Sequence, residues 1–92
     1  MSKPVSRTIV ISGQFQDDLR YWIENDRRTA LRILDLMAAI QVHPFAGIGK
    51  PEPLRFDLAG CWSRRITRGD RLNYRVLADR LEFVQARYHY NE

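Results

Sequence analysis

The stretch CWSRRITRGDRLNYRVL, residues 61–77, decides the fold that we expect for this chain. Side chains alternate between two faces over Cys61–Thr67 and again over Asp70–Leu77, where Leu72 and Tyr74 belong to an apolar face. A period of two is typical of a β-strand that packs one face on a core. The turn residues between the two runs predict that they form an antiparallel hairpin.

The length of the turn sets which arginines face each other. A three-residue loop at 67–69, with Gly69 in the left-handed region, would pair Arg65 with Arg71. The two guanidinium groups would then share one face and repel each other unless an anion lay between them, as in a phosphate site. A two-residue loop at 68–69 would pair Arg65 with Leu72 and send the arginines to opposite faces. The sequence leaves both registers open.

Two amphipathic helices precede the hairpin. Over Gln14–Asn25 the apolar residues recur at helical spacing: Phe15, Leu19, Trp22 and Ile23. Asp26 is a good N-cap for a second helix over Arg27–Val42, whose apolar stripe is Ala30, Ile33, Leu34, Met37 and Ile40 or Gln41. The connection between them is so short that the two helices form a helical hairpin.

The remaining segments complete a sheet. Arg7–Ser12 contains a β-branched run and predicts a buried strand, while His43–Pro53, with three of the four prolines, predicts a loop. Leu54–Leu58 alternates like a strand, and a tight turn at 78–79 leads into a last strand over Arg80–Tyr88. The predicted order β-α-α-β-β-β is an α+β fold, a mostly antiparallel sheet with the helical hairpin packed on one face.

Length and composition favour one globular domain. The 92 residues suit a single domain, 1–92, with residues 1–6 as a loose tail. The content of 45% hydrophobic and 28% charged residues argues against intrinsic disorder. No apolar run approaches the roughly 20 residues that span a bilayer, so we expect no membrane segment. Because Cys61 has no partner for a disulfide and no secretory leader is recognisable, we expect a cytoplasmic protein.

Basic residues are concentrated in one stretch. Lys3 and Lys50 are the only lysines among 15 basic residues, which leaves 13 arginines, the residue suited to bidentate contacts with phosphate. From Lys50 to Arg75, seven basic residues outweigh three acidic ones, whereas the rest of the chain is neutral. This pattern predicts one basic patch. The patch is either a solvated face or a surface for an acidic partner, nucleic acid or an acidic protein segment.

Metal and nucleotide sites are not indicated. His43 and His89 are far apart in the sequence and Cys61 is alone, so no ligand set has the spacing of a metal site, and we expect no cofactor. Residues 47–50, Gly-Ile-Gly-Lys, superficially resemble a phosphate-binding loop. They lack the full motif, and we interpret them as a connector.

The residues that remain form a set able to cleave RNA without a metal. The carboxylate of Glu52 can remove the proton of a 2′-hydroxyl, the imidazole of His89 can protonate the leaving oxygen, and arginines can stabilise the phosphorane. Tyr88 and Tyr90 can stack on bases or donate hydrogen bonds. Each residue alone has an ordinary structural explanation, and only their combination suggests this chemistry.

Four ordered segments carry a resemblance to a known family. They are PFAGIGKPEPL at 44–54, LAGCWSRRI at 58–66, RLNY at 71–74 and RYHY at 87–90. Together they resemble the YoeB (Txe) branch of the RelE/ParE toxin superfamily, and the two preceding helices suit the RelE-like microbial RNase fold. The resemblance implies a toxin of a bacterial type II toxin–antitoxin system. It further implies an endoribonuclease that enters the ribosomal A site and cuts messenger RNA to a 2′,3′-cyclic phosphate, thereby inhibiting translation.

The resemblance also implies a role for individual residues. Its catalytic set is the general base Glu52, the phosphate-stabilising Arg71, the general acid His89 and the phosphate-orienting Tyr90. Its RNA-binding set is Lys50, Arg55 and Arg65. The implied partners are messenger RNA, the ribosome and an antitoxin similar to YefM, whose acidic C-terminal segment would occlude the site, while a homodimer is left open.

This chain departs from the family pattern at three places. Cys61 replaces a bulkier aromatic residue, the amino terminus is longer, and Asn91-Glu92 follow the usual terminal tyrosine. If Glu92 folded back, its carboxylate would raise the pKa of His89. Two alternatives to the nuclease stay open: a non-catalytic, gyrase-directed toxin like ParE, and a protein that merely sequesters antitoxin.

Overall fold

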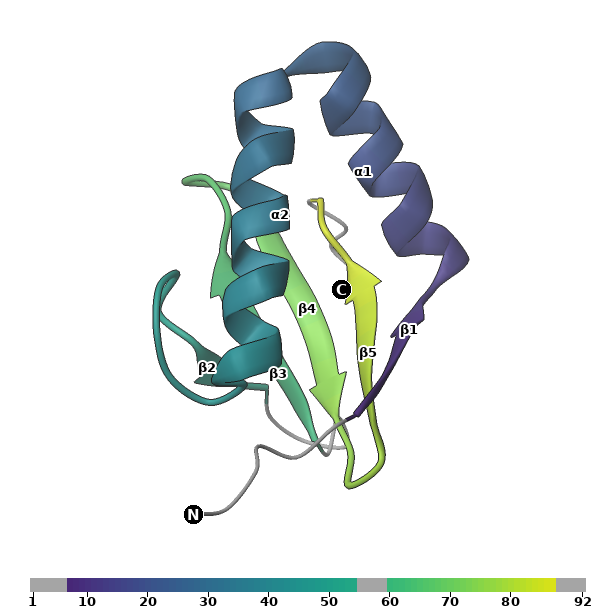
Figure 1. Cartoon of the computed structure of the whole chain (residues 1–92). Coiled ribbons are helices and arrows are strands. Elements are labelled where there is room, and N and C mark those ends of the chain that lie inside the picture. Colours follow the sequence, from purple (N-terminus) through teal and green to yellow (C-terminus); the bar gives the residue numbers. More distant parts are fainter. Residues whose placement is uncertain (1–6, 55–59, 88–92) are drawn as a thin grey trace.

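A computed structural model describes residues 7–54 and 60–87 of the chain. In sequence order the elements are β1 (Thr8–Ile11), α1 (Gly13–Asn25), α2 (Arg27–Val42), β2 (Glu52–Pro53), β3 (Cys61–Arg65), β4 (Arg71–Val76) and β5 (Arg80–Gln85). The strands form one sheet in the order β1-β5-β4-β3-β2, and both helices lie on the same face of it (Figure 1). Only β1 and β5 are parallel, so the predicted α+β fold with a mostly antiparallel sheet is confirmed.

The hairpin at 61–77 has the longer of the two predicted loops. Arg65 pairs with Arg71, and the N–H of Ile66 donates to the carbonyl of Asp70 at 2.9 Å. The expectation of a left-handed Gly69 is wrong, because among the glycines of the described residues φ is positive at Gly47, Gly49 and Gly60 and not at Gly69. The Thr67 hydroxyl closes the loop instead, since it accepts from the N–H groups of Gly69 and Asp70.

The short strand β2 corrects two predictions. Glu52 pairs with Ser63 and Pro53 with Trp62, so the predicted loop His43–Pro53 ends in a strand. A proline is tolerated there because β2 is an edge strand, where one missing donor costs little. In the predicted strand Leu54–Leu58, Leu54 belongs to no strand, and residues 55–59 lie outside the described part of the chain.

Strand β1 is placed correctly by the sequence, but the prediction that it is buried is wrong. Its four residues are exposed, including Ile9, Val10 and Ile11. The physical reason is its position at the sheet edge, where β5 is its one neighbour within the sheet. The β-branched run therefore predicts a strand here, but it does not predict whether the strand is buried.

The core lies between the helices and the inner face of the sheet. Asp26 caps α2, as predicted, by accepting from the N–H of Thr29, and Ser12 caps α1 by accepting from the N–H of Phe15. The buried cluster contains Phe15, Ile33, Leu36, Ile40, Ile66, Leu72, Tyr74, Leu81, Phe83 and Ala86. The buried face of α2 is turned slightly from the predicted one, because Leu36 is inside while Leu34 is exposed.

The last strand ends earlier than predicted. β5 stops at Gln85, because the backbone of Ala86 bonds to side chains of α1 instead of to a strand. The buried Asp18 accepts from the N–H of Ala86 at 2.9 Å, and the Trp22 indole donates to its carbonyl at 2.8 Å. The predicted end at Tyr88 lies outside the described residues.

Candidate functional site

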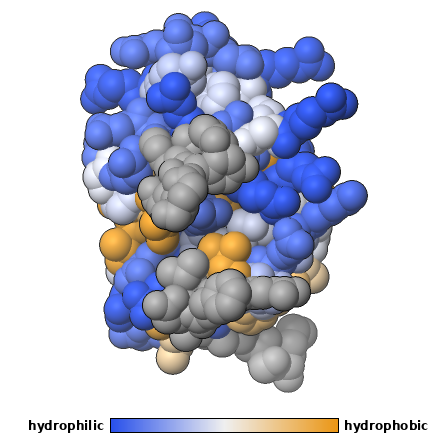
Figure 2. Space-filling view, turned by 180° about the vertical axis from the view of Figure 1, so that it is seen from behind, coloured by the Kyte–Doolittle hydropathy of each residue, from blue (hydrophilic) through white to orange (hydrophobic). Residues whose placement is uncertain are grey.

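The face of the sheet opposite the helices carries the polar residues singled out from the sequence. Figure 2 views this side and shows many hydrophilic side chains on it, together with smaller apolar patches. Alternation along β3 and β4 brings polar residues onto this face in register, with Arg65 opposite Arg71 and Ser63 opposite Asn73. Glu52 pairs with Ser63 from the other side. Three strands therefore deliver Glu52, Ser63 and Arg71 to one place.

Arg71 is held by two partners on this face. Its Nη1 donates to Oε1 of Glu52 at 3.0 Å and to Oγ of Ser63 at 3.2 Å. The side chains of Arg71 and Glu52 are 43% and 59% exposed, whereas Ser63 is buried. A buried hydroxyl thus orients a guanidinium that is partly exposed. We call Glu52, Ser63, Arg65 and Arg71 the open-face cluster.

Two further cations border this cluster. Arg65 is exposed beside Arg71, and its N–H donates to the carbonyl of Gly49 at 2.7 Å. Lys50, the next residue, is exposed and has a φ of 51°, a left-handed conformation that costs a residue other than glycine about 1 kcal/mol. Such strain at an exposed cation is typical of a functional position. Arg32 of α2 holds the end of β3 in place by donating to the carbonyls of Arg65 and Ile66.

A carboxylate of the chain itself offsets the repulsion expected between Arg65 and Arg71. The neighbouring carboxylate of Glu52 supplies a counter-charge to Arg71. The open-face cluster consequently combines a proton acceptor and two guanidinium groups on one face. Such a set can bind a phosphodiester and accept a proton from a group next to it.

Not every basic residue of the predicted patch belongs to the surface. Arg64 is fully buried and donates to backbone carbonyls, so counting it in the basic patch is wrong. The sequence contained a signal for this, since Arg64 shares its strand face with Trp62 and Ile66. Arg75 lies on the open face but pairs with Glu82 at 3.8 Å, away from the open-face cluster. Arg55, His89 and Tyr90 lie outside the described residues.

Sequence reasoning missed Ser63 and the anchor at the end of β5. Ser63 gave a usable signal, because alternation puts it on the same face as Arg65. The anchor left no local sequence signal, because its contacts join the end of β5 to α1. Ala86 bonds to Asp18 and Trp22, and the guanidinium of Arg87 lies 3.4 Å from the centre of the Tyr21 ring. These contacts fix where the chain leaves the sheet, two residues before His89.

Other features of the described residues are distinct from this cluster. Among residues 7–54 and 60–87, no three His, Cys, Asp or Glu side chains are grouped as metal ligands would be. No helix in these ranges is long and apolar enough to cross a membrane. Burial raises the pKa of the Cys61 thiol above its usual value, which makes it a weaker nucleophile.

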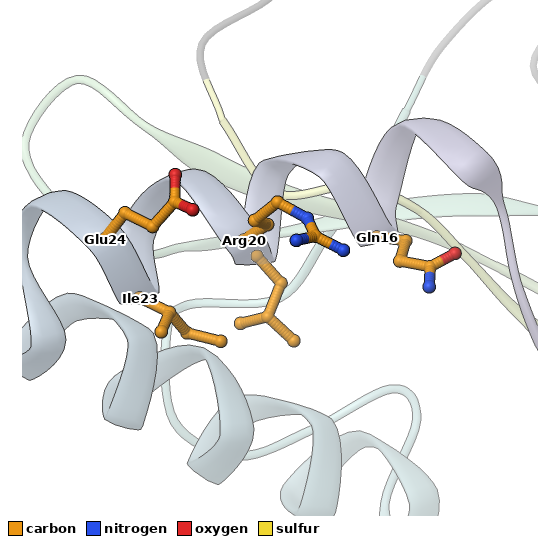
Figure 3. A pocket seen from close by; sticks show the side chains of 5 residues that line it. Gln16, Arg20, Ile23 and Glu24 are labelled. Atoms are coloured by element: carbon orange, nitrogen blue, oxygen red, sulfur yellow. The ribbon is translucent and has the colours of Figure 1, made fainter.

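A shallow groove runs along α1, on the helical side of the molecule (Figure 3). Leu19 and Ile23 give it an apolar floor, and Ile23 points toward the neighbouring helix, while Gln16, Arg20 and Glu24 line it with polar groups. The sequence marked none of these polar residues as a site. The groove contains no member of the open-face cluster.

Comparison with known proteins gives a consistent family. The model of the YoeB-like toxins of bacterial type II toxin–antitoxin systems matches residues 11–90. The protein named Toxin YoeB from Streptomyces coelicolor is 53% identical over 82 residues, which cover 89% of this chain and 98% of that protein.

Solved structures agree with the sequence match. The YoeB/ParE toxin from Agrobacterium tumefaciens superimposes with a TM-score of 0.84 at 46% identity, covering 90% of this chain and 99% of that one. Two structures of YoeB from Staphylococcus aureus, both 35% identical, are a dimer, with a TM-score of 0.82, and a heterotetrameric complex with YefM, with a TM-score of 0.80. They cover 91% and 92% of this chain and 98% and 99% of theirs.

Proposed function

Because this chain belongs to the YoeB-like toxins of bacterial type II toxin–antitoxin systems, we propose that it acts by metal-independent cleavage of messenger RNA in the ribosomal A site. The observation that carries the proposal is the contact between Glu52 and Arg71, whose side chains meet at 3.0 Å on the open face of the sheet. A carboxylate and a guanidinium at one exposed point supply both a general base and a group that stabilises phosphorane charge.

The proposed reaction uses the 2′-hydroxyl of the RNA as the nucleophile. Glu52 takes the hydroxyl proton while the 2′-oxygen attacks the neighbouring phosphorus, and Arg71 stabilises the charge that develops on the non-bridging oxygens. The bond from phosphorus to the 5′-oxygen then breaks, and His89 supplies the proton that this oxygen takes up. Tyr90 orients the phosphate. The products are a 2′,3′-cyclic phosphate and a 5′-hydroxyl end.

When RNA binds, a phosphate has to replace Glu52 as the partner of Arg71. Ion pairs as exposed as that of Glu52 and Arg71 contribute only about 0–1 kcal/mol, so a phosphate can displace the carboxylate at little cost. The displaced carboxylate is then free to accept a proton. Ser63 keeps the guanidinium on the open face during this exchange, because its buried hydroxyl accepts from the same Nη1.

The remaining basic residues bind the RNA backbone in this proposal. Arg65 and Lys50 are exposed next to the cluster, and Arg55 completes the set on sequence grounds. So few cations give modest affinity for a mobile single strand at physiological salt. A ribosome that holds the strand would remove most of the entropic cost, which is the reason for assigning the A site as the place of cleavage. Action there makes the protein cytoplasmic.

The proposed protein partner is an antitoxin similar to YefM. The related YoeB from Staphylococcus aureus is seen in a heterotetrameric complex with YefM and also as a dimer. An acidic antitoxin segment complements a chain with a net charge of +4, and it would compete with RNA for Arg65 and Arg71. We extend the dimer to this chain as part of the same proposal, with residues 1–92 forming one domain.

Paired arginine variants test the proposal. Arg71 and Arg75 are on the same strand and face, and their side chains are 43% and 44% exposed, so Arg75→Ala is a matched control for Arg71→Ala. With purified protein and ribosomes programmed with a defined messenger RNA, Arg71→Ala should slow cleavage by about 10²- to 10³-fold. Glu52→Gln should slow it by about 10²- to 10⁴-fold. Arg75→Ala should cleave at the wild-type rate.

Three results would contradict this proposal. Equal rates for Arg71→Ala and Arg75→Ala would remove Arg71 from the chemistry. Growth arrest with intact messenger RNA and damaged DNA would instead indicate a gyrase-directed toxin, and no toxicity of the chain alone would indicate a sequestering protein.

A further inference from the structure

A buried polar network ties the segment 43–50 to the sheet. Arg64 is fully buried on β3, and its guanidinium donates to the carbonyls of His43, of Ala46 at 3.0 Å and of Ile48 at 3.1 Å. Its Nε donates to the Tyr74 hydroxyl at 3.1 Å, and that hydroxyl donates to the carbonyl of Pro44 at 2.7 Å. Two side chains thus satisfy four carbonyls of a segment that has neither helix nor strand.

This network does more than a packed apolar residue would. Burying a charge carries a desolvation cost that can exceed the gain from its hydrogen bonds, so a core arginine is not explained by stability alone. Burial also raises the pKa of the Tyr74 hydroxyl above its usual value, which keeps it protonated as a donor to Pro44. The planar guanidinium suits several carbonyls at once, whereas a lysine ammonium is a compact point charge with three donors.

The tethered segment leads directly into the open-face cluster. Gly49, at its end, accepts from the N–H of Arg65, the residue after Arg64. Lys50 then adopts its left-handed conformation, and Glu52 pairs with Ser63, the residue before Arg64. Consecutive residues of β3 therefore hold the segment from the core side and meet Glu52 and Arg71 on the open side.

We propose that Arg64 is a positioning residue, which holds segment 43–50 so that the Glu52 carboxylate stays in place beside Arg71. This inference rests on the proposed function, because it assigns Arg64 a role through the base of that reaction. Arg64 touches no RNA. Its effect is on the placement of Glu52, where a displacement of about 1 Å can cost roughly 100-fold in rate.

The test uses a variant that loses the planar guanidinium of Arg64 and keeps its positive charge. Arg64→Lys is compared with wild type and with Arg75→Lys, an arginine to lysine change on the open face outside the cluster. In the ribosome cleavage assay, Arg64→Lys should lower kcat roughly 10- to 100-fold and change KM less than about threefold, because RNA-binding cations are untouched. Arg75→Lys should match wild type in both constants.

A double variant separates positioning from general destabilisation. If Arg64 acts through Glu52, then Glu52→Gln combined with Arg64→Lys cleaves no more slowly than Glu52→Gln alone. A double variant whose rate loss equals the product of the two single losses would overturn the proposal. A folded Arg64→Lys protein with wild-type kcat would also overturn it. Should Arg64→Lys fail to fold, Tyr74→Phe, which removes the bond to Pro44, should lower kcat about two- to tenfold, and an unchanged kcat would overturn the proposal.

A measurement without RNA distinguishes failure of this inference from failure of the proposed function. Amide hydrogen exchange over residues 45–52 should be at least about tenfold faster in whichever of Arg64→Lys and Tyr74→Phe folds, with α2 unchanged, since the segment is then less well held. Unchanged exchange in that segment would overturn the role of Arg64 even if the nuclease is real. Absence of cleavage by wild type would refute the nuclease, and the exchange result would still decide whether Arg64 holds the segment.

Discussion

Replacing Gly49 by alanine should destabilise the protein severely. Gly49 has a φ of 85°, and an added Cβ would lie 2.9 Å from Cδ2 of Leu36, 3.1 Å from Cβ of Arg64 and 3.3 Å from the carbonyl oxygen of Arg65. The left-handed backbone costs alanine about 1 kcal/mol, and overpacking a core costs about 1 to 3 kcal/mol. The sum is about 2 to 4 kcal/mol.

That loss is large for a domain of this size. A chain of 92 residues is expected to have a free energy of unfolding of about 5 to 14 kcal/mol, and each kcal/mol shifts the Tm by roughly 4 to 8 °C. Gly49→Ala should therefore lower the Tm by roughly 8 to 32 °C, measured by circular dichroism and checked by urea unfolding.

The matched control is Gly13→Ala. Gly13 begins α1 with no heavy atom within 4 Å of an added Cβ, so alanine should leave the stability unchanged or raise it by up to about 1 kcal/mol. A Gly49→Ala protein within 1 kcal/mol of wild type would refute the reasoning, because it would mean that the segment does not approach Leu36 and Arg64 so closely.

Three further outcomes follow from individual contacts. Ser63→Ala should slow cleavage roughly two- to tenfold, because one bond that orients Arg71 is lost; an unchanged rate in the ribosome assay would contradict this. Lys50→Ala should weaken RNA binding and lower the slope of log affinity against log salt by about 1, measured by titration at several salt concentrations. Hydrogen bonds from the hydroxyl and then the N–H of Thr29 lower the pKa of Asp26 from 3.8, so its stabilising effect is present above pH 3.8 and lost as the pH falls through the folded-state pKa. In urea unfolding, the stability difference between wild type and Asp26→Ala should therefore be constant near neutral pH and shrink below pH 3.8, whereas a constant difference at acid pH would contradict the cap.

The fold was predictable wherever the deciding contacts are local. Helical spacing and an N-cap at Asp26 placed both helices, and alternation placed β3 and β4, because these patterns act over a few residues. The exposure of β1 was not predictable, since it depends on the position of β1 at the edge of the sheet. The end of β5 likewise depends on Asp18 and Trp22, which are more than sixty residues away in sequence.

The candidate site was predictable in part. Alternation brought Arg65 opposite Arg71 once the turn length was known, and the structure resolves that choice. The contact of Glu52 with Arg71 required β2, a two-residue strand too short to leave a pattern. Arg64 was misassigned because net charge counts an arginine equally whether its guanidinium faces water or is buried against four hydrogen-bond acceptors.

The central claim is that this toxin cuts messenger RNA on the ribosome with the help of His89. The most direct measurement induces wild type and His89→Gln in cells without antitoxin and maps new messenger-RNA ends against the reading frame, with the chemistry of each end determined. We expect ends locked to the reading frame, with 2′,3′-cyclic phosphates, that are about 10²- to 10⁴-fold fewer for His89→Gln. Growth arrest without such ends, or equal cutting by His89→Gln, would contradict it.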